Sequence, residues 1–491
     1  MNRILLGKAE HDVHLLAEYG NRHGLVAGAT GTGKTVSLMV LAEGFSRLGV
    51  PVFMADVKGD VAGLAMPGTV DERISERAQR VGITDFVLEA SPVVFWDVYG
   101  HDGHRVRTTV SEVGPRLLGH MLELNDVQSG VLDITVKLAD DRGLLLLDLD
   151  DLRSLLTFVA DNRKQISTDY GLVASQSVAA IQRALLRLEQ EGGEAFFGEP
   201  ALELTDLLRT NLDGCGIINV LAAEKLVLKP RLYSTFLLWL LSELFENLPE
   251  AGDLDKPKLV FMFDEAHLLF DDAPPALLQR VEQVVRIIRS KGVGVYFCTQ
   301  YPDDVPEDIL GQLGNRVQHA LRAHTPRDLK AVRTAAETFV PNPAIEVAEV
   351  IAQLATGEAL VSTLQAKGVP APVERTLIRP PHCRMGALTR EERALILSRS
   401  PLGVKYDTSI NRESAHELLN RRAQSTTDAS DPHPAEDGKG GRLGEMIWGT
   451  KRRQGMVETL AKQVARTLGS QLGRRIVRGV LGGIAGSARR G

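Results

Sequence analysis

The feature that most constrains this chain is an eight-residue stretch, Gly28-Ala29-Thr30-Gly31-Thr32-Gly33-Lys34-Thr35. It matches the pattern G-x-x-x-x-G-K-[ST] at every fixed position. The four residues before it, Gly24 to Ala27, are small and apolar, as a buried strand requires, and the residues after it can form a helix. Glycines at such a turn leave backbone N–H groups open to phosphate oxygens, and the helix N-terminus favours anions. The stretch therefore predicts a phosphate-binding loop.

We expect all eight residues of this loop to contact a nucleotide, ATP. Lys34 would reach the β- and γ-phosphates, and the Thr35 hydroxyl would bind Mg²⁺. A chance glycine-rich turn is the alternative. The agreement of motif, preceding strand and following helix favours the functional interpretation.

Composition places few further limits on the chain. With 491 residues, of which 44% are hydrophobic, it is long enough for about three domain-sized units with a real core. Its three cysteines, Cys215, Cys298 and Cys383, are far apart, so neither a zinc site nor a disulfide framework is indicated. The N-terminus lacks the apolar core of a signal peptide, and no apolar run approaches the roughly 20 residues of a membrane-spanning helix. We expect a cytoplasmic protein with no integral membrane segment.

A second motif lies 230 positions after Lys34. The five apolar residues Leu259 to Phe263 predict a central strand, and Asp264-Glu265 follow it, which is the Walker B pattern. Asp264 would hold Mg²⁺, directly or through water, and Glu265 can act as general base toward the attacking water. The alternative is a solvated turn after a strand, which the presence of both motifs in one chain disfavours.

Two further strand ends carry polar residues. Gln300 follows the apolar run that begins at Val293, so its amide could contact the γ-phosphate or the water; a plain strand-end glutamine is the alternative. Asp56 ends the strand that begins at Val50, and there a ligand role and a turn role are equally supported. His267 is expected to be structural.

Strands that alternate with helices predict an α/β fold with a parallel, doubly wound sheet. Residues 105–208 differ, because their apolar spacing is helical, and they predict a helical insertion. We divide the chain into six segments: core residues 1–104 and 209–380, the insertion 105–208, a short helical extension 381–423, a disordered linker 424–442 and a tail 443–491.

The tail is basic and amphipathic. Residues 443–491 contain ten Lys/Arg and two Glu, a net charge of +8 in a chain whose total is −6. Such an asymmetry indicates an anionic partner, either DNA or an anionic membrane surface. The apolar residues at helical spacing also allow a docked helix.

Together these motifs resemble the HerA–FtsK superfamily of P-loop ATPases. The resemblance rests on His23, the loop 28–35, Asp264-Glu265-Ala266-His267 and Thr299-Gln300, and it covers residues 1–380. It is closest to bacterial HerA-like proteins with a helical insertion. The resemblance implies a RecA-like motor domain, a homohexameric ring and ATP sites between subunits. The N-terminal β-barrel of HerA and the winged helix of FtsK are not evident in the sequence.

A ring ATPase of this kind also needs a cation supplied by the neighbouring subunit. The candidates are Arg286, Arg289, Arg316 and Arg322. We favour Arg316, since it follows shortly after the strand that ends at Gln300. A surface arginine in an ion pair is the alternative for each of them.

Three functional hypotheses follow. The first is a hexameric DNA translocase or helicase-like motor. The second is a membrane-peripheral assembly or secretion ATPase that uses the tail as an interfacial anchor. A nucleotide switch without motor action is a third. A DEAH-box helicase is disfavoured because no Ser-Ala-Thr motif follows Asp264, and an ABC ATPase because no LSGGQ signature precedes it.

Overall fold

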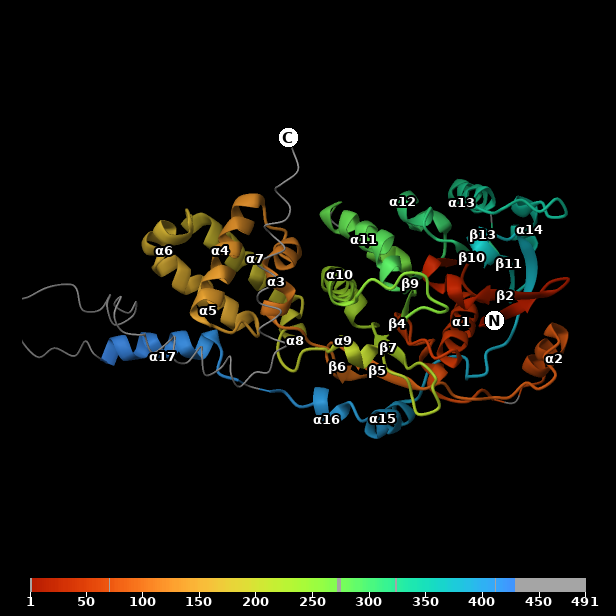
Figure 1. Cartoon of the computed structure of the whole chain (residues 1–491), viewed down its shortest axis with the longest axis horizontal. Coiled ribbons are helices and arrows are strands. Elements are labelled where there is room, and N and C mark those ends of the chain that lie inside the picture. The colour runs from red at the N-terminus through yellow and green to blue at the C-terminus, as the bar shows by residue number, and fades with distance from the viewer. Residues whose placement is uncertain (1, 70, 272–274, 323–324, 411, 429–491) are drawn as a thin grey trace, which may run out of the picture. The chain divides into compact units, whose positions relative to one another are not determined.

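The computed structural model describes residues 2–428 except residues 70, 272–274, 323–324 and 411. The chain divides into two compact units. The first consists of Met1–Val106 with Pro200–Thr408, and the second of Arg107–Glu199 with the residues from Ser409 onward. Figure 1 shows the chain with many of its helices and strands labelled. The structure thus separates a sheet-containing unit from a helical one.

The first unit contains a twelve-stranded sheet. Eight neighbouring strands are parallel, which confirms the predicted parallel, doubly wound sheet. In spatial order they are β10 (Asn315–His319), β3 (Gly24–Ala27), β9 (Val293–Thr299), β8 (Leu259–Phe263), β4 (Val52–Asp56), β7 (Ile218–Ala222), β5 (Val93–Asp97) and β6 (His104–Arg105). Every residue of β4, β8 and β9 is buried, so helices and loops cover both faces of the sheet there.

Four antiparallel strands, none of them predicted from the sequence, extend the sheet beyond β10. They are β11 (Glu358–Ser362), β14 (Glu374–Ile378), β1 (Arg3–Lys8) and β2 (Asp12–Leu16). In β1, β2 and β14 buried residues largely alternate with more exposed ones, as is typical of antiparallel strands near an edge, whereas β11 is buried from its second residue onward. A separate two-stranded sheet joins β12 (Leu364–Gln365) to β13 (Val369–Pro370).

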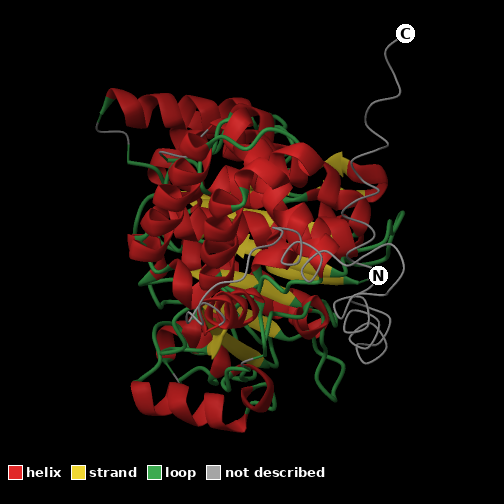
Figure 2. Ribbon diagram, turned by 90° about the vertical axis from the view of Figure 1, so that its left-hand side faces the viewer, coloured by secondary structure: helices red, strands yellow, loops and turns green. Residues whose placement is uncertain are grey.

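Helices alternate along the chain with the strands of this unit. Figure 2 draws helices in red and strands in yellow. The α-helices are α1 (Lys34–Arg47), α2 (Glu72–Val81), α9 (Leu204–Leu207), α10 (Pro230–Asn247), α11 (Pro275–Ile288), α12 (Glu307–Leu310), α13 (Pro326–Glu337), α14 (Val347–Gln353), α15 (Arg390–Arg399) and α16 (Gly403–Tyr406). Helix α1 follows the glycine-rich loop directly, as predicted, and packs its apolar residues against β1, β3 and β4. The loop is therefore anchored on both sides by core elements.

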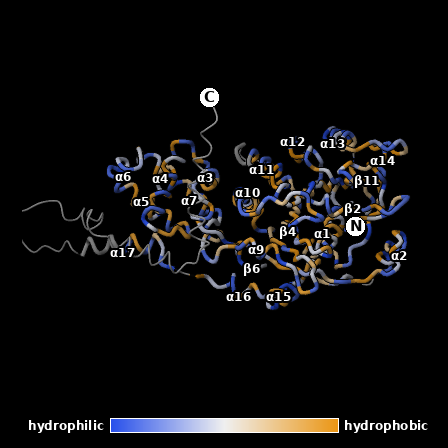
Figure 3. The backbone as a smooth tube through the Cα atoms, viewed as in Figure 1, coloured by the Kyte–Doolittle hydropathy of each residue, from blue (hydrophilic) through white to orange (hydrophobic). Residues whose placement is uncertain are grey.

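The second unit is helical. It contains α3 (Val110–Met121), α4 (Asp126–Arg142), α5 (Leu149–Asp161), α6 (Arg163–Tyr170), α7 (Ser175–Gln190), α8 (Gly193–Phe196) and α17 (Ala415–Asp428). Hydrophobic and hydrophilic segments alternate along its helices, as expected of amphipathic helices around a shared core (Figure 3). Residue Ser154 of α5 bonds to His416 of α17 at 2.7 Å. The segment 381–423 is thus shared: α15 and α16 belong to the first unit and α17 to the second.

The C-terminal segments are covered only in part. The predicted linker, residues 424–442, begins within α17, which ends at Asp428. The tail, residues 443–491, lies outside the described residues. None of the helices in the described part of the chain is both long and apolar enough to cross a bilayer.

Candidate nucleotide site

The predicted phosphate loop and the predicted polar residues Gln300, Asp264 and Asp56 lie at the carboxyl ends of four adjacent strands. Strand β3 leads into Gly28, β9 into Gln300, β8 into Asp264, and β4 ends at Asp56. The register places Ala27 beside Thr299, and Ala55 beside Phe263. Ligands of parallel sheets bind at the carboxyl ends of strands. The fold therefore brings the loop 28–35 and both acidic motifs to the same edge.

The glycine-rich loop is held in a shape that exposes backbone donors. Gly33 has φ 117°, a conformation that side chains rarely adopt, and α1 begins at the next residue. The N–H groups in the first turn of an α-helix have no carbonyl partner within the helix. In α1 the Ser37 N–H donates to Gly33 O at 3.1 Å. The Lys34 ammonium donates to Gly28 O at 2.7 Å and to Ala29 O at 3.3 Å. This is a cradle suited to phosphate oxygens.

A buried histidine supports the loop from below. A Cβ at Gly28 would lie 2.6 Å from the His319 Cβ, so only glycine fits this contact. The His319 Nδ1 lies 2.9 Å from Glu358 O, and burial lowers the pKa of the ring to about 4, so it is neutral at pH 7. His319 was not among the predicted site residues. The sequence signal that could have identified it is a polar residue at the end of a strand, here β10, which pairs with the strand that leads into the loop.

Asp264 is a buried carboxylate with few counter-charges. Burial raises its pKa, and the neighbouring Glu265 charge adds to the effect, while the Cys298 thiol hydrogen-bonds to it and opposes the shift. Burial also raises the pKa of Asp56 to about 7, and Asp264 contributes to that rise. Asp56 accepts a hydrogen bond from Gly59 N–H at 2.8 Å. Two carboxyl groups thus lie together in a buried site that favours a cation.

Glu265 occupies an unusual backbone conformation. Its φ of 47° and ψ of 52° are left-handed, which is strained for a residue with a side chain. Asp264 Oδ1 accepts its backbone N–H at 3.0 Å, and the Lys58 ammonium pairs with its side chain. Burial disfavours the Glu265 charge, but Lys58, His267 and Lys34 together lower its pKa. Glu265 is therefore ionised at neutral pH, as a general base must be.

Lys58 was missed as a site residue. It lies two positions after Asp56, the end of β4, and its pairing with Glu265 spans 207 positions. Its only sequence signal is a cationic residue just after a buried strand of a parallel sheet.

The remaining predicted residues lie in different settings. Gln300 follows β9, between the strands that lead to the glycine loop and to Asp264. Thr35 is the second residue of α1. Arg316 lies toward the amino end of β10, where it pairs with Leu25 rather than with the loop, and its guanidinium donates to Leu310 O at 3.0 Å. Its role in a neighbouring subunit stays a prediction.

The other three arginines also make contacts within the chain. Arg286 pairs with Glu282 at 2.6 Å, and Arg322 donates to Ala352 O at 2.9 Å. Burial lowers the pKa of Arg289, whose backbone carbonyl accepts from Asn21. None of these contacts favours one of the three as the residue donated to a neighbour.

The donor set suits Mg²⁺ bound together with phosphates. Among the residues with described positions, no three or more His, Cys, Asp or Glu side chains gather as a complete metal site. Mg²⁺ commonly takes one or two protein ligands and completes its shell with water and phosphate oxygens. The buried Asp264 carboxylate and the Thr35 hydroxyl are ligands of that kind.

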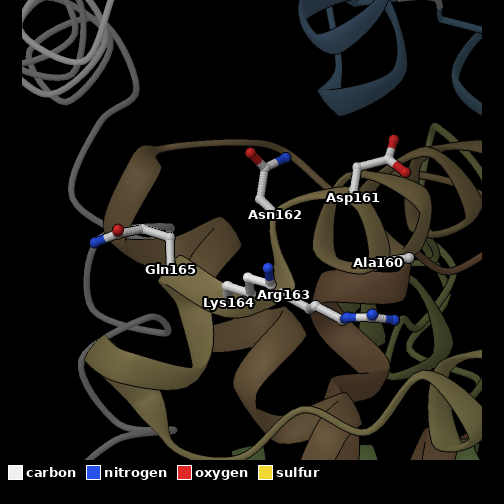
Figure 4. A pocket seen from close by; sticks show the side chains of 6 residues that line it. All are labelled: Ala160, Asp161, Asn162, Arg163, Lys164 and Gln165. Atoms are coloured by element: carbon white, nitrogen blue, oxygen red, sulfur yellow. The ribbon is translucent and has the colours of Figure 1, made fainter. Parts of the chain in front are cut away.

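A separate hollow lies at the turn between α5 and α6. It is lined by Ala160, Asp161, Asn162, Arg163, Lys164 and Gln165. Figure 4 shows that these side chains spread in different directions instead of converging on one point. None of the predicted site residues lines it, so we assign it no ligand.

Comparison with known proteins identifies the family. The family described as "Helicase HerA-like C-terminal" matches residues 1–490. The chain belongs to this HerA-like family. The match confirms the resemblance to the HerA–FtsK superfamily drawn from the motifs. A search of curated proteins finds no match to this HerA-like chain.

Solved structures share the fold of this HerA-like protein. The bacterial conjugative coupling protein TrwBdeltaN70, in an unbound form, is 16% identical with a TM-score of 0.51, over 77% of this chain and 91% of that one. The plasmid coupling protein TrwB in complex with the GTP analogue GDPNP is 17% identical with a TM-score of 0.50, over 76% and 88% of the two chains. TrwB in complex with the ATP analogue ADPNP is 17% identical with a TM-score of 0.50, over 75% of this chain and 87% of that one. At this identity the likeness establishes a RecA-like P-loop fold.

Proposed function

We propose that this HerA-like chain binds and hydrolyses ATP as a motor ATPase. The single observation that carries the proposal is the shared sheet edge, where the loop 28–35 follows β3 and the pair Asp264-Glu265 follows β8, with only β9 between these two strands. Two TrwB structures with bound nucleotide analogues show the same fold. A phosphate cradle beside a buried acidic pair is the arrangement that phosphoryl transfer to water needs.

In this proposal each residue has a defined task. The backbone amides of the loop and the Lys34 ammonium hold the phosphates. Thr35 and Asp264 hold Mg²⁺, which neutralises phosphate charge when bound. Glu265 accepts a proton from the attacking water, and Gln300 contacts the water or the γ-phosphate.

We further propose that the chain works in the cytoplasm as a homohexameric ring that translocates DNA. The HerA-like family supports the motor, and the charge of +8 over residues 443–491 supports a polyanionic partner. Arg316 is the proposed cation for the neighbouring site. In that case its hydrogen bond to Leu310 O would have to open in the ring.

An anionic membrane surface is the second candidate partner. The final eighteen residues, Arg474–Gly491, combine arginines with apolar residues, namely Ile476, Val477, Val480, Leu481 and Ile484. Such a segment suits a lipid interface as well as DNA. In that case the same motor would serve assembly or secretion at a membrane.

One set of measurements tests these proposals. ATP hydrolysis by the purified full-length chain is compared with that of Lys34→Ala and of a control, Lys291→Ala, whose lysine pairs with Glu250. We expect hydrolysis that is lost in Lys34→Ala, kept in the control and stimulated by double-stranded DNA, from a particle of hexameric mass. Hydrolysis equal in wild type and Lys34→Ala contradicts the ATPase proposal.

The partner is tested by DNA filter binding beside liposome flotation. Binding to DNA with stimulated hydrolysis supports the translocase. Flotation with anionic vesicles and no DNA response supports the membrane candidate and contradicts the translocase.

A further inference from the structure

The loop after β4 carries a lysine that reaches the predicted catalytic base. Lys58 Nζ pairs with Oε1 of Glu265, and the pairing of β4 with β8 brings their two loops together. The Glu265 side chain is 5% exposed, whereas that of Lys58 is 44% exposed. The pair therefore joins a buried acid to a lysine that solvent can reach.

The two carboxylate oxygens of Glu265 differ in their surroundings. Oε1 is held by Lys58. Oε2 is buried and has no hydrogen-bond partner among the described residues. The His267 Nδ1 atom lies 3.4 Å from Oε2. Buried carboxylate oxygens normally have a partner, so an open acceptor here suggests a functional role.

We propose that Lys58 is a positioning residue for ATP hydrolysis, which fixes Oε1 of Glu265 and so presents Oε2 to the attacking water. The inference rests on the proposed function. In the reaction, the water oxygen bonds to the γ-phosphorus and the bond to the β-phosphate oxygen breaks. ADP leaves with that electron pair, and the water proton passes to Oε2.

The backbone conformation of Glu265 is also consistent with a fixed position for its side chain. Glu265 holds a left-handed conformation, and its N–H is fixed by Asp264 Oδ1 at 3.0 Å. The backbone is therefore set by Asp264, and the side chain by Lys58. A general base must lie within hydrogen-bond reach of its proton, and a small displacement of it is costly.

The competing interpretation is that Lys58 binds phosphate directly. The two roles predict different kinetics. Loss of a phosphate contact made equally in ground and transition states raises KM for ATP, whereas loss of base positioning lowers kcat and leaves KM nearly unchanged. A guanidinium can replace an ammonium in an ion pair with a carboxylate.

The first test is therefore kinetic. We expect Lys58→Ala to lower kcat by about ten- to a hundredfold with KM for ATP within about twofold of wild type. Lys58→Arg should recover most of the loss. The control is Lys225→Ala, an exposed lysine after β7 whose partner is Asp102. A raised KM with unchanged kcat, or an arginine variant as impaired as alanine, overturns the proposal.

The second test uses binding and stability, so it does not depend on turnover. A fluorescent ATP analogue should bind Lys58→Ala and wild type equally well. Without nucleotide, Lys58→Ala should lower the melting temperature of the wild-type protein. The same substitution should have little effect on the melting temperature of Glu265→Gln, because that variant has already lost the ion pair. Equal effects in both backgrounds contradict the pairing role.

The two proposals can fail separately. If Glu265→Gln hydrolyses ATP at the wild-type rate, the base assignment is wrong and Lys58 positions nothing. If Glu265→Gln is inactive while Lys58→Ala keeps the wild-type kcat, only the inference about Lys58 is overturned.

Discussion

Ser37 in the first turns of α1 and His319 at the end of β10 are joined by a hydrogen bond of 2.8 Å beneath the glycine-rich loop. The other ring nitrogen of His319 faces Glu358 O, which can only accept, so Nδ1 carries the proton and Ser37 donates to Nε2. The ring thereby connects α1, β10 and β11. The phosphate loop rests on this connection, with Gly28 in contact with the His319 side chain.

The first prediction concerns Gly28. A methyl group at this position would lie 2.6 Å from the His319 Cβ, and Gly28 also has φ 149°. We expect Gly28→Ala to push the loop off His319, to weaken ATP binding at least tenfold and to lower the melting temperature. The control is Gly214→Ala, where φ is 82° but nothing lies within 4 Å of the added Cβ. Equal binding by Gly28→Ala and wild type would show that the loop does not rest on the histidine.

The second prediction concerns pH. Burial lowers the pKa of His23 and of His319 to about 4. In the unfolded chain both have a pKa near 6.5, so below that pH the unfolded state binds protons that the folded state does not. Each histidine should therefore lower the free energy of unfolding by on the order of 2 kcal/mol at pH 5, and by almost nothing above pH 7.

Chemical denaturation at pH 7.5 and pH 5.0 measures this loss. His23 accepts from Val295 N–H at 3.0 Å through Nδ1, an atom that the Oδ1 of asparagine can replace. His23→Asn should therefore show a smaller loss between the two pH values than wild type. A stability that does not fall toward pH 5 would mean that the rings are not buried in neutral form.

Some strands of the fold could be predicted from the sequence and others could not. Strands β8 and β9 are continuous apolar runs ended by polar residues, and a buried parallel strand needs that pattern, so they were foreseen. Strand β10 (Asn-Arg-Val-Gln-His) and strand β14 (Glu-Arg-Thr-Leu-Ile) contain several polar residues. Only their long-range partners make them strands, so local pattern could not reveal them.

The candidate site likewise contains residues that the sequence could predict and residues that it could not. The loop 28–35 and the pair Asp264-Glu265 are local motifs with fixed spacing, and the sequence contained all that was needed to propose them. Lys58 and His319 act through contacts that span 207 and 282 positions, respectively. Such contacts depend on strand order, which the sequence analysis did not specify.

The third prediction concerns the tail. Removal of residues 443–491 should leave basal ATP hydrolysis intact, lower affinity for the anionic partner and flatten the salt dependence of DNA binding, because ten basic residues are lost. Filter binding and flotation across a salt series measure this. Equal binding by truncated and full-length protein to both DNA and anionic vesicles would assign the tail a structural role.

The fourth prediction concerns assembly. If Arg316 completes the site of a neighbour, Arg316→Ala and Lys34→Ala are each inactive alone. Mixed rings should regain activity, since some interfaces combine an intact loop with an intact arginine. Light scattering with ATP present should show a hexamer. A monomer under those conditions, or no recovery on mixing, would remove the role of Arg316 between subunits.

The most direct test of the account is the ATP hydrolysis rate of Glu265→Gln. Glutamine keeps the size of the side chain but cannot accept the proton, so turnover should fall by about a hundredfold or more, while ATP binding remains. The control is Glu89→Gln, an exposed glutamate paired with Arg47. A Glu265→Gln variant that binds ATP and barely hydrolyses it is the predicted result. Hydrolysis at the wild-type rate would contradict the assignment of Glu265 as the catalytic base.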